Sequence, residues 1–277
     1  MNIWLILLTL FGACLIASSI GFKKFVWFLS IGYGFSVMAC GIAMAIIFAI
    51  ESKLNITGLI ACILLVVYGF RLGGFLLIRE LKSASYKKAM SKEMDTEKKM
   101  PLPVLISIWV IVCFLYVWEV GGITFVMYHR DPNAGFFSIG ILEIIGLVIM
   151  SAGILIEGIA DHQKSVQKKD NPKMPAMKGL YKICRCPNYY GEILFWTGVV
   201  TYSFASVLSN TWWQWVFIAL GYICIVYIMF NGAKRLELRQ AKNYGENEEF
   251  KAYIAKTPIL IYLCIPVKSL KDSKIVK

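Results

Sequence analysis

The sequence has little charge, and least of all acidic charge. Asp and Glu number 17 in 277 residues, against 29 Lys and Arg, and charged residues make up 17% of the chain. Soluble domains average about 25% charged and about 45–50% apolar residues, whereas 58% of this chain is hydrophobic. Together with the mean hydropathy of +0.65, this composition excludes an ordinary soluble domain and indicates an integral membrane protein.

The signatures of several soluble enzyme classes are also absent. There is no G-x-G-x-x-G after a strand, no P-loop, no HExxH and no G-x-S-x-G, so we expect neither a Rossmann site nor a serine hydrolase. Cys184 and Cys186 form a C-x-C pair with no second pair, and His162 stands alone, so we predict no metal site. The other cysteines stand in or beside apolar runs and are expected to be small core residues without a disulfide framework: Cys14, Cys40, Cys62, Cys113, Cys224 and Cys264.

Long apolar runs recur along the whole chain. Met1-Asn-Ile-Trp4 lacks a basic n-region and no cleavage site stands out, so we expect the first run to be a retained span. A helix needs about 20 residues to cross a bilayer, and seven runs come near this length: 3–21, 25–50, 54–78, 103–127, 136–158, 192–209 and 212–232. The sequence therefore predicts an all-α polytopic membrane protein with seven transmembrane helices.

The basic residues predict an orientation. All but three of the 29 Lys and Arg fall in alternate links and in the tail, at 22–24, 79–102, 159–191 and 233–277. By the positive-inside rule the C-terminus lies in the cytoplasm and the N-terminus outside. The net charge of +12 is explained by this topology and by anionic lipid, so we expect no nucleic-acid partner. A bacterial inner membrane or an endoplasmic-reticulum-like membrane is expected.

A few polar residues interrupt the apolar runs of the first half. Tyr68 and Arg71 lie three apart and share one helix face, and we expect Arg71 to face a polar cavity, because a guanidinium in lipid needs a partner or water. Arg79 alone would snorkel to the interface. Glu119 and Glu143 would either form structural pairs, for example with Arg130, or line an outer vestibule, and we expect structural pairs.

A second polar group closes the fifth run. Glu157 and Asp161 are four apart on one helix face, and Lys164 and Lys168 continue that face. Carboxylates followed by basic residues suit the ribose and the phosphate of a nucleotide. They suit a solvated helix end equally well.

One segment carries a resemblance to a known family. Gly179-Leu-Tyr181 followed by Pro187-Asn-Tyr-Tyr-Gly-Glu192 closely resembles the C-terminal signature of the steroid 5-alpha-reductase family, whose superfamily includes sterol reductases and isoprenylcysteine carboxyl methyltransferases. Asp161, the tail around Glu237 and Tyr244, and Tyr68-x-x-Arg71 fall in the expected order. The similarity covers the chain from about residue 65 onward.

The resemblance implies a single integral membrane domain, 1–277, in which 1–128 encloses a lipophilic substrate and 136–277 binds NADPH on the cytoplasmic side. The implied reaction is hydride transfer to the carbon–carbon double bond of a 3-oxo-4-ene steroid or a similar lipophilic enone, with Tyr68 bonding the substrate carbonyl. No protein partner is implied. By resemblance the cofactor-binding residues are Arg71, Arg79, Glu157, Asp161, Lys168, Tyr181, Asn188, Tyr189, Glu192, Arg235, Glu237 and Tyr244.

The chain departs from the family pattern in three places, one of which is Glu157, where the steroid enzymes favour an amide. Steroid reductases place a carboxylate beside the Tyr, but 27–34 contains no acid, so Tyr33 or Ser30 would substitute as a catalytic donor, or an acid from elsewhere would reach in. Cys186 stands where bacterial relatives and the methyltransferases commonly have His. The alternatives are a methyltransferase that uses S-adenosylmethionine, which Asp161 and Glu192 disfavour, and a non-enzymatic lipid-binding or transport protein.

Overall fold

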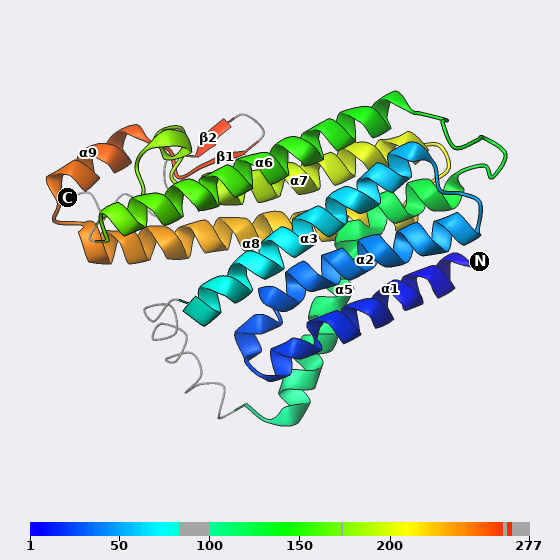
Figure 1. Cartoon of the computed structure of the whole chain (residues 1–277), viewed down its shortest axis with the longest axis horizontal. Coiled ribbons are helices and arrows are strands. Elements are labelled where there is room, and N and C mark those ends of the chain that lie inside the picture. The colour runs from blue at the N-terminus through cyan, green and yellow to red at the C-terminus, as the bar shows by residue number, and fades with distance from the viewer. Residues whose placement is uncertain (83–99, 173, 263–264, 268–277) are drawn as a thin grey trace. The chain divides into compact units, whose positions relative to one another are not determined.

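The structure is a computed structural model of the chain, and it describes residues 1–82, 100–172, 174–262 and 265–267. Most of the described chain is helical (Figure 1). The helices are α1 Ile3–Ser18, α2 Ile31–Ile50, α3 Ile56–Lys82, α5 Leu102–His129, α6 Ile141–Asp170, α7 Pro187–Ser203, α8 Trp212–Tyr244 and α9 Glu248–Lys256. Short 3-10 turns follow or precede them: η1 Ser19–Phe22, η2 Phe25–Trp27, η3 Gly179–Lys182 and η4 Phe204–Ser206.

Six of these helices are long and apolar enough to cross a membrane by length and composition, which confirms a multi-pass helical membrane architecture. They coincide with every expected run except 192–209. That run falls on α7, which has 17 residues and then breaks into the η4 turn. The seventh crossing and the orientation of the termini therefore stay predictions.

Some predictions fall on parts of the chain that the structure does not describe. The basic charges expected at 83–99 and 268–277, and the core position of Cys264, lie outside the described residues. Among the cysteines that are described, Cys14, Cys40, Cys62 and Cys113 are buried as expected, whereas Cys224 is only half-buried.

The chain divides into two compact units that do not follow chain order. Unit 1 contains Met1–Leu147 and Val199–Tyr222, and unit 2 contains Val148–Gly198 and Ile223–Lys277. The helices α6, α7 and α8 each contribute residues to both units.

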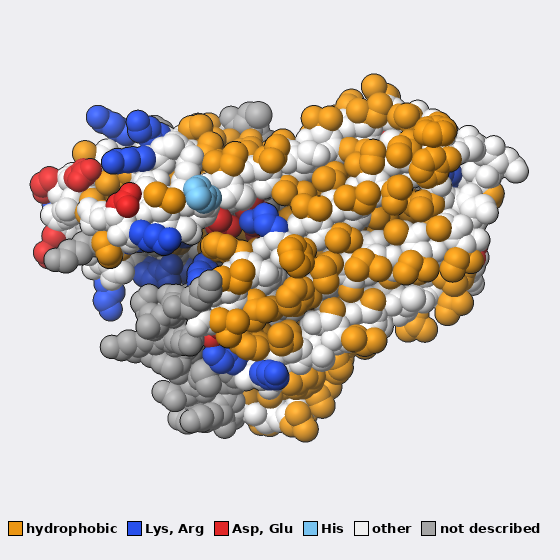
Figure 2. Space-filling model, viewed as in Figure 1, with side chains coloured by type: hydrophobic (Ala, Val, Ile, Leu, Met, Phe, Trp, Pro, Cys, Tyr) orange, Lys and Arg blue, Asp and Glu red, His pale blue; other side chains and the backbone are white. Residues whose placement is uncertain are grey.

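Unit 1 is built around the close contact of α2 with α3, which lie side by side in Figure 1. A Cβ atom added to Gly34 would lie 2.6 Å from the Gly73 amide nitrogen, and one added to Gly69 would lie 2.3 Å from the Gly34 carbonyl oxygen. Only glycine permits backbones to approach this closely, as at other small-residue contacts of membrane helices. This approach brings the neighbouring residues, Tyr33 on α2 and Tyr68 on α3, across from one another. Hydrophobic side chains cover much of the surface of these helices (Figure 2).

Unit 2 contains a second glycine contact, between α6 and α7. A Cβ atom on Gly153 would lie 2.5 Å from the Phe195 amide nitrogen, and one on Gly191 would lie 2.7 Å from the Glu157 amide nitrogen. The two helices therefore run in backbone contact past Glu157.

Hydrogen bonds to the C-terminal part of unit 2 hold the segment that leads into α7. The amides of Arg185 and Cys186 donate to the carbonyl oxygens of Pro258 and Ile259 over 2.8 and 3.0 Å. The sequence from Leu260 then forms an antiparallel hairpin of β1 Leu260–Tyr262 and β2 Ile265–Val267. The segment before α7 is thus held by residues about 70 positions later in the chain.

Candidate functional site

Two tyrosine hydroxyls meet in the buried part of unit 1. The hydroxyls of Tyr33 and Tyr68 lie 3.0 Å apart, and both side chains are buried. The ring of Tyr116 packs 5.2 Å from the Tyr33 ring, and its hydroxyl donates to the carbonyl oxygen of Phe28. Each hydroxyl carries one proton and two lone pairs, so either tyrosine can be the donor in this bond.

The structure distinguishes between the two donors proposed for α2. The Ser30 hydroxyl donates to the carbonyl oxygen of Val26, four residues earlier, which is a local helix-end bond. Tyr33, and not Ser30, is therefore the residue that the fold brings to Tyr68.

The two arginines expected near the cofactor follow on the same helix. Arg71 is half-buried one turn after Tyr68. Arg79 lies near the end of α3, and its guanidinium carbon is 5.5 Å from the centre of the Phe75 ring. This contact and its partial burial fit a side chain that runs along the helix toward the interface.

A basic cavity opens in unit 2. Its volume is about 80 Å³, and its lining includes four cationic side chains, those of Lys164, Lys168, Arg185 and Arg239. A site needs about 10–15 Å³ of such space to hold one water molecule, so the cavity is large enough for a small polyatomic anion. We call this the basic cavity; it is a candidate phosphate site.

Two helices supply most of its lining. Lys164 and Lys168 stand one turn apart on α6, and α8 contributes Leu236, Arg239, Gln240, Asn243 and Tyr244, which recur every three or four residues and so share one face. The Lys168 ammonium donates to the Tyr244 hydroxyl over 2.9 Å and to the Pro172 carbonyl oxygen over 3.1 Å. Its position is therefore fixed at the wall of the cavity.

Arg185 and Arg239 are lining residues that the sequence prediction missed. Arg185 is 4% exposed; its guanidinium forms an ion pair with Glu237 at 3.0 Å and donates to the Thr257 carbonyl oxygen over 3.1 Å. The signal for Arg185 was its place between two cysteines, since a cation in a buried stretch needs a partner. Arg239 had the signal of its spacing, one helical turn after Arg235.

The two cysteines that flank Arg185, Cys184 and Cys186, have unreactive thiols. Burial raises the pKa of the Cys184 thiol to about 11, and it raises the pKa of the Cys186 thiol to about 12 although the positive charge of Lys164 opposes the rise. Both thiols are protonated at neutral pH, and the thiol is neither the nucleophile nor the metal-binding form. No group of three His, Cys, Asp or Glu side chains in the described part of the chain could hold a metal ion.

Three carboxylates occupy the α6–α7 region of unit 2. Glu157 and Glu192 are 3% and 6% exposed, and Asp161 is half-buried one turn after Glu157. The backbone contact of Gly191 with Glu157 places the residue before Glu192 directly on α6. Buried carboxylates accept hydrogen bonds, so this region suits the hydroxyl and amide donors of a ligand.

The remaining predicted residues are divided between lining and support. Tyr181 lines the basic cavity, yet its hydroxyl donates to the Ala160 carbonyl oxygen and so also holds η3 on α6. At the start of α7, Asn188 is half-buried, and the Tyr189 ring packs on Gly232 of α8. Arg235 is exposed. Among the described residues, the lining of the basic cavity includes Arg239, one helical turn later, and not Arg235.

The fold and these clusters define a multi-pass helical membrane protein with a buried phenol pair and a separate basic cavity. The chain belongs to the family described as "Protein of unknown function (DUF1295)", whose profile matches residues 15–257, and this is a family of steroid 5-alpha-reductase-like membrane proteins. The resemblance seen in the sequence is thus confirmed at the level of the family. No curated protein and no solved structure matched the chain.

Proposed function

We propose that this protein reduces the carbon–carbon double bond of a 3-oxo-4-ene steroid, or of a similar lipophilic enone, with NADPH. The observation that carries the proposal is the basic cavity, with its four cationic side chains. NADPH brings phosphate groups to such a cavity, including the 2′-phosphate that NADH lacks. S-adenosylmethionine has no phosphate and carries a positive sulfonium, so the same cations disfavour the methyltransferase alternative.

The residues of unit 2 fit the chemical groups of the cofactor. Lys164, Lys168 and Arg239 would hold phosphate oxygens, because hydrogen bonds between ionised partners are the strong ones. The charge of Arg185 is partly neutralised by Glu237. Arg185 would therefore hold the site in shape more than bind the phosphate. The buried carboxylates Glu157 and Glu192 would accept hydrogen bonds from ribose hydroxyls or from a carboxamide. When bound, NADPH supplies the hydride.

The phenol pair of unit 1 fits the substrate half of the reaction. Addition of a hydride to the carbon β to a carbonyl shifts the double-bond electrons onto the carbonyl oxygen. Tyr68 would donate its O–H to that oxygen, and Tyr33 would donate in turn to Tyr68, so the developing charge is spread over two phenols. Both side chains are buried, and a hydrogen bond is electrostatically stronger in such a low-dielectric site than in water. A phenol is also a competent proton source for the α-carbon.

We also propose that α7 is the seventh crossing, which puts the N-terminus outside and the C-terminus in the cytoplasm. The outer ends of α6 and α8 each contact the end of α5, through Glu143 with Arg130 and Gln214 with His129. Their other ends contact each other through Lys168 and Tyr244. These contacts support an arrangement in which α6 and α8 cross in the same direction and α7 returns between them. Its 17 residues give about 25 Å of helix, and η4 extends it toward the roughly 30 Å of a hydrocarbon core.

Single cysteines at Lys178 and Lys242, on a background with the native cysteines replaced, test the crossing. If α7 and α8 both cross, a membrane-impermeant thiol reagent labels both sites from the same side. Labelling of the two sites from opposite sides would show that α7 does not cross.

Ligand binding tests the cofactor assignment. We expect NADPH to raise the melting temperature of the detergent-purified protein, with NADH weaker and S-adenosylmethionine without effect. With Lys168 assigned to the 2′-phosphate, Lys168→Ala should weaken NADPH binding about 10- to 100-fold, the value of one hydrogen bond to a charged group, and should leave NADH, which lacks that phosphate, nearly unchanged. Lys169→Ala is the matched control, since Lys169 is exposed on the same helix. Stabilisation by S-adenosylmethionine alone would refute the proposal.

Turnover tests the reaction. We expect consumption of NADPH with a 3-oxo-4-ene steroid or another lipophilic enone, and Tyr68→Phe should lower kcat while NADPH binding is kept. If the protein binds NADPH but no enone in a panel of steroids and quinone-like compounds leads to its oxidation, the reductase proposal is wrong. The non-enzymatic lipid-binding alternative would then be favoured.

A further inference from the structure

A second polar cavity lies in unit 1, and none of the residues assigned to the proposed reaction lines it. Its volume is about 340 Å³, and it lies between the α2–α3 link and the α5–α6 link. Its lining carries both signs of charge, with the cations Lys53 and Arg130 and the carboxylate Asp131. We call it the outer cavity, since the proposed topology puts these links outside.

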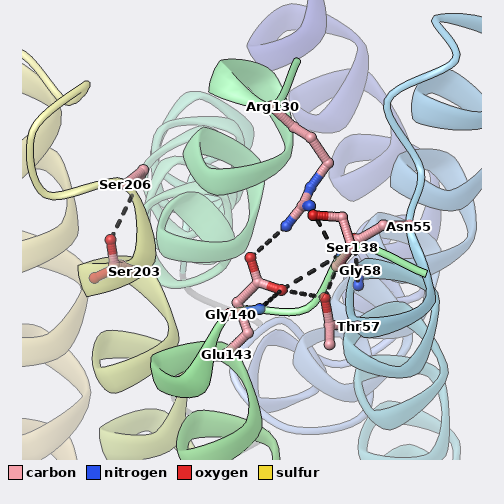
Figure 3. Close-up of polar contacts among 9 residues, drawn as sticks. All are labelled: Asn55, Thr57, Gly58, Arg130, Ser138, Gly140, Glu143, Ser203 and Ser206. Atoms are coloured by element: carbon pink, nitrogen blue, oxygen red, sulfur yellow. Dashed lines mark hydrogen bonds and ion pairs between the residues drawn. The ribbon is translucent and has the colours of Figure 1, made fainter. Parts of the chain in front are cut away.

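The walls of the outer cavity are held by a buried hydrogen-bond network, drawn in Figure 3. The Glu143 carboxylate accepts hydrogen bonds from Arg130 and from the Thr57 hydroxyl. The Asn55 amide donates to the Ser138 carbonyl oxygen over 2.7 Å. The Ile56 amide donates to the Phe136 carbonyl oxygen over 2.9 Å. The two links are therefore tied together before any ligand arrives, which lowers the entropy that binding must cost.

The charges at the rim keep capacity to bind. Lys53 has three N–H donors; its ammonium donates to the Tyr128 carbonyl oxygen and lies 5.0 Å from the centre of the Tyr128 ring. One oxygen of Asp131 accepts from the amide of Asn133, and in the described part of the chain no group donates to its second oxygen. A cation and a carboxylate thus stand at the same opening, each with hydrogen-bonding groups to offer.

Apolar side chains surround this end of unit 1. Ile50 is 76% exposed, Phe136 is 42% exposed and lines the cavity, and Phe137 is 80% exposed. In the proposed topology these links lie at the outer end of the spans, so exposed apolar side chains there adjoin the hydrocarbon region. A ligand in the outer cavity would then sit where lipid headgroups meet acyl chains.

We propose that the outer cavity binds the headgroup of a phosphatidylethanolamine-type lipid. Lys53, with Arg130 behind it, faces the phosphate, and Asp131 accepts a hydrogen bond from the primary ammonium. Phe136 and Phe137 lie against the glycerol and the first acyl carbons. A purely anionic headgroup would be repelled by Asp131. A choline headgroup has no N–H to donate to that carboxylate. This site is independent of the proposed reductase activity.

Native mass spectrometry of the delipidated full-length protein tests the proposal. Phosphatidylethanolamine, phosphatidylcholine and phosphatidylglycerol of one acyl composition are added in turn, and the dissociation constants are compared. We expect the ethanolamine lipid to bind at least about 10-fold tighter than the other two. This factor corresponds to one charge-assisted hydrogen bond. Lys53→Gln should weaken the ethanolamine lipid about 10-fold. Asp131→Asn should abolish its advantage over the choline lipid, because asparagine keeps the oxygen that holds Asn133 but not the charge.

Lys23→Gln is the matched control, because Lys23 is an exposed lysine in a different link of the same unit, and it should change nothing. Equal binding of the three lipids by the unchanged protein, or unchanged selectivity in both variants, would overturn the proposal. Soluble phosphoethanolamine is a further arm. If it raises the melting temperature while no lipid is retained, the occupant is a free phosphate ester and the lipid assignment is wrong.

Discussion

Gly153→Ala is the substitution whose effect follows most directly from the geometry. The added Cβ would lie 2.5 Å from the Phe195 amide nitrogen and 2.7 Å from the Gly191 carbonyl oxygen. Both are backbone atoms, which cannot rotate away as a side chain would, so α6 and α7 must separate. Overpacking costs about 1–3 kcal/mol, and the better helix propensity of alanine returns up to about 1 kcal/mol. We expect a net loss of about 1–2 kcal/mol.

Thermal unfolding in detergent, followed by tryptophan fluorescence, measures this loss. A change of this size should lower the melting temperature by roughly 2–8 °C for a chain of this length. Gly12→Ala is the matched control, because no atom lies within 4 Å of the added Cβ in α1. It should stabilise by about 0.5–1 kcal/mol. If both variants shift the melting temperature in the same direction, the glycine contact between α6 and α7 is not as described.

Three further results are expected. Cys186 has a pKa raised to about 12 by burial, so iodoacetamide at pH 8 should modify it only after unfolding, and labelling of the folded protein would contradict its burial. Glu237→Ala removes the carboxylate partner of buried Arg185 and should cost about 3–5 kcal/mol in a melt, whereas Glu248→Ala, in an exposed pair, should cost below about 1 kcal/mol. Tyr33→Phe should lower enone turnover and leave the KM for NADPH unchanged; a loss of NADPH binding instead would show a different role.

The helices were predictable because a bilayer demands a physical pattern that the sequence itself carries. Unbroken apolar runs of about 20 residues leave a helix as the only structure that satisfies the backbone in lipid, and six of the expected runs correspond to helices that qualify as candidate spans. The 192–209 run was displaced toward its N-terminus, since α7 starts at Pro187, where a proline is favoured in the first turn. Polar residues such as Asn188 lie inside the helix, and hydropathy alone had left them out.

The candidate site was only partly predictable. Lys168 and Tyr244 were named from the sequence and line the basic cavity together. Arg185 and Arg239 were missed because their relevance depends on which helix face meets which, and a single sequence does not encode that choice in any local pattern. The absence of an acid in 27–34 likewise left the choice between Ser30 and Tyr33 open.

By itself the sequence determined that this protein is a helical membrane protein with its basic residues in alternate links, and it carried the signature of its family. Both follow from local properties, namely hydropathy, charge and the order of a short motif. Only the tertiary structure decided that Tyr33 meets Tyr68, because the Gly34 and Gly69 contact sets the register of α2 on α3. It alone also gathered Lys164, Lys168, Arg185 and Arg239 around one cavity. These juxtapositions depend on backbone approaches of a few ångströms between residues distant in the chain.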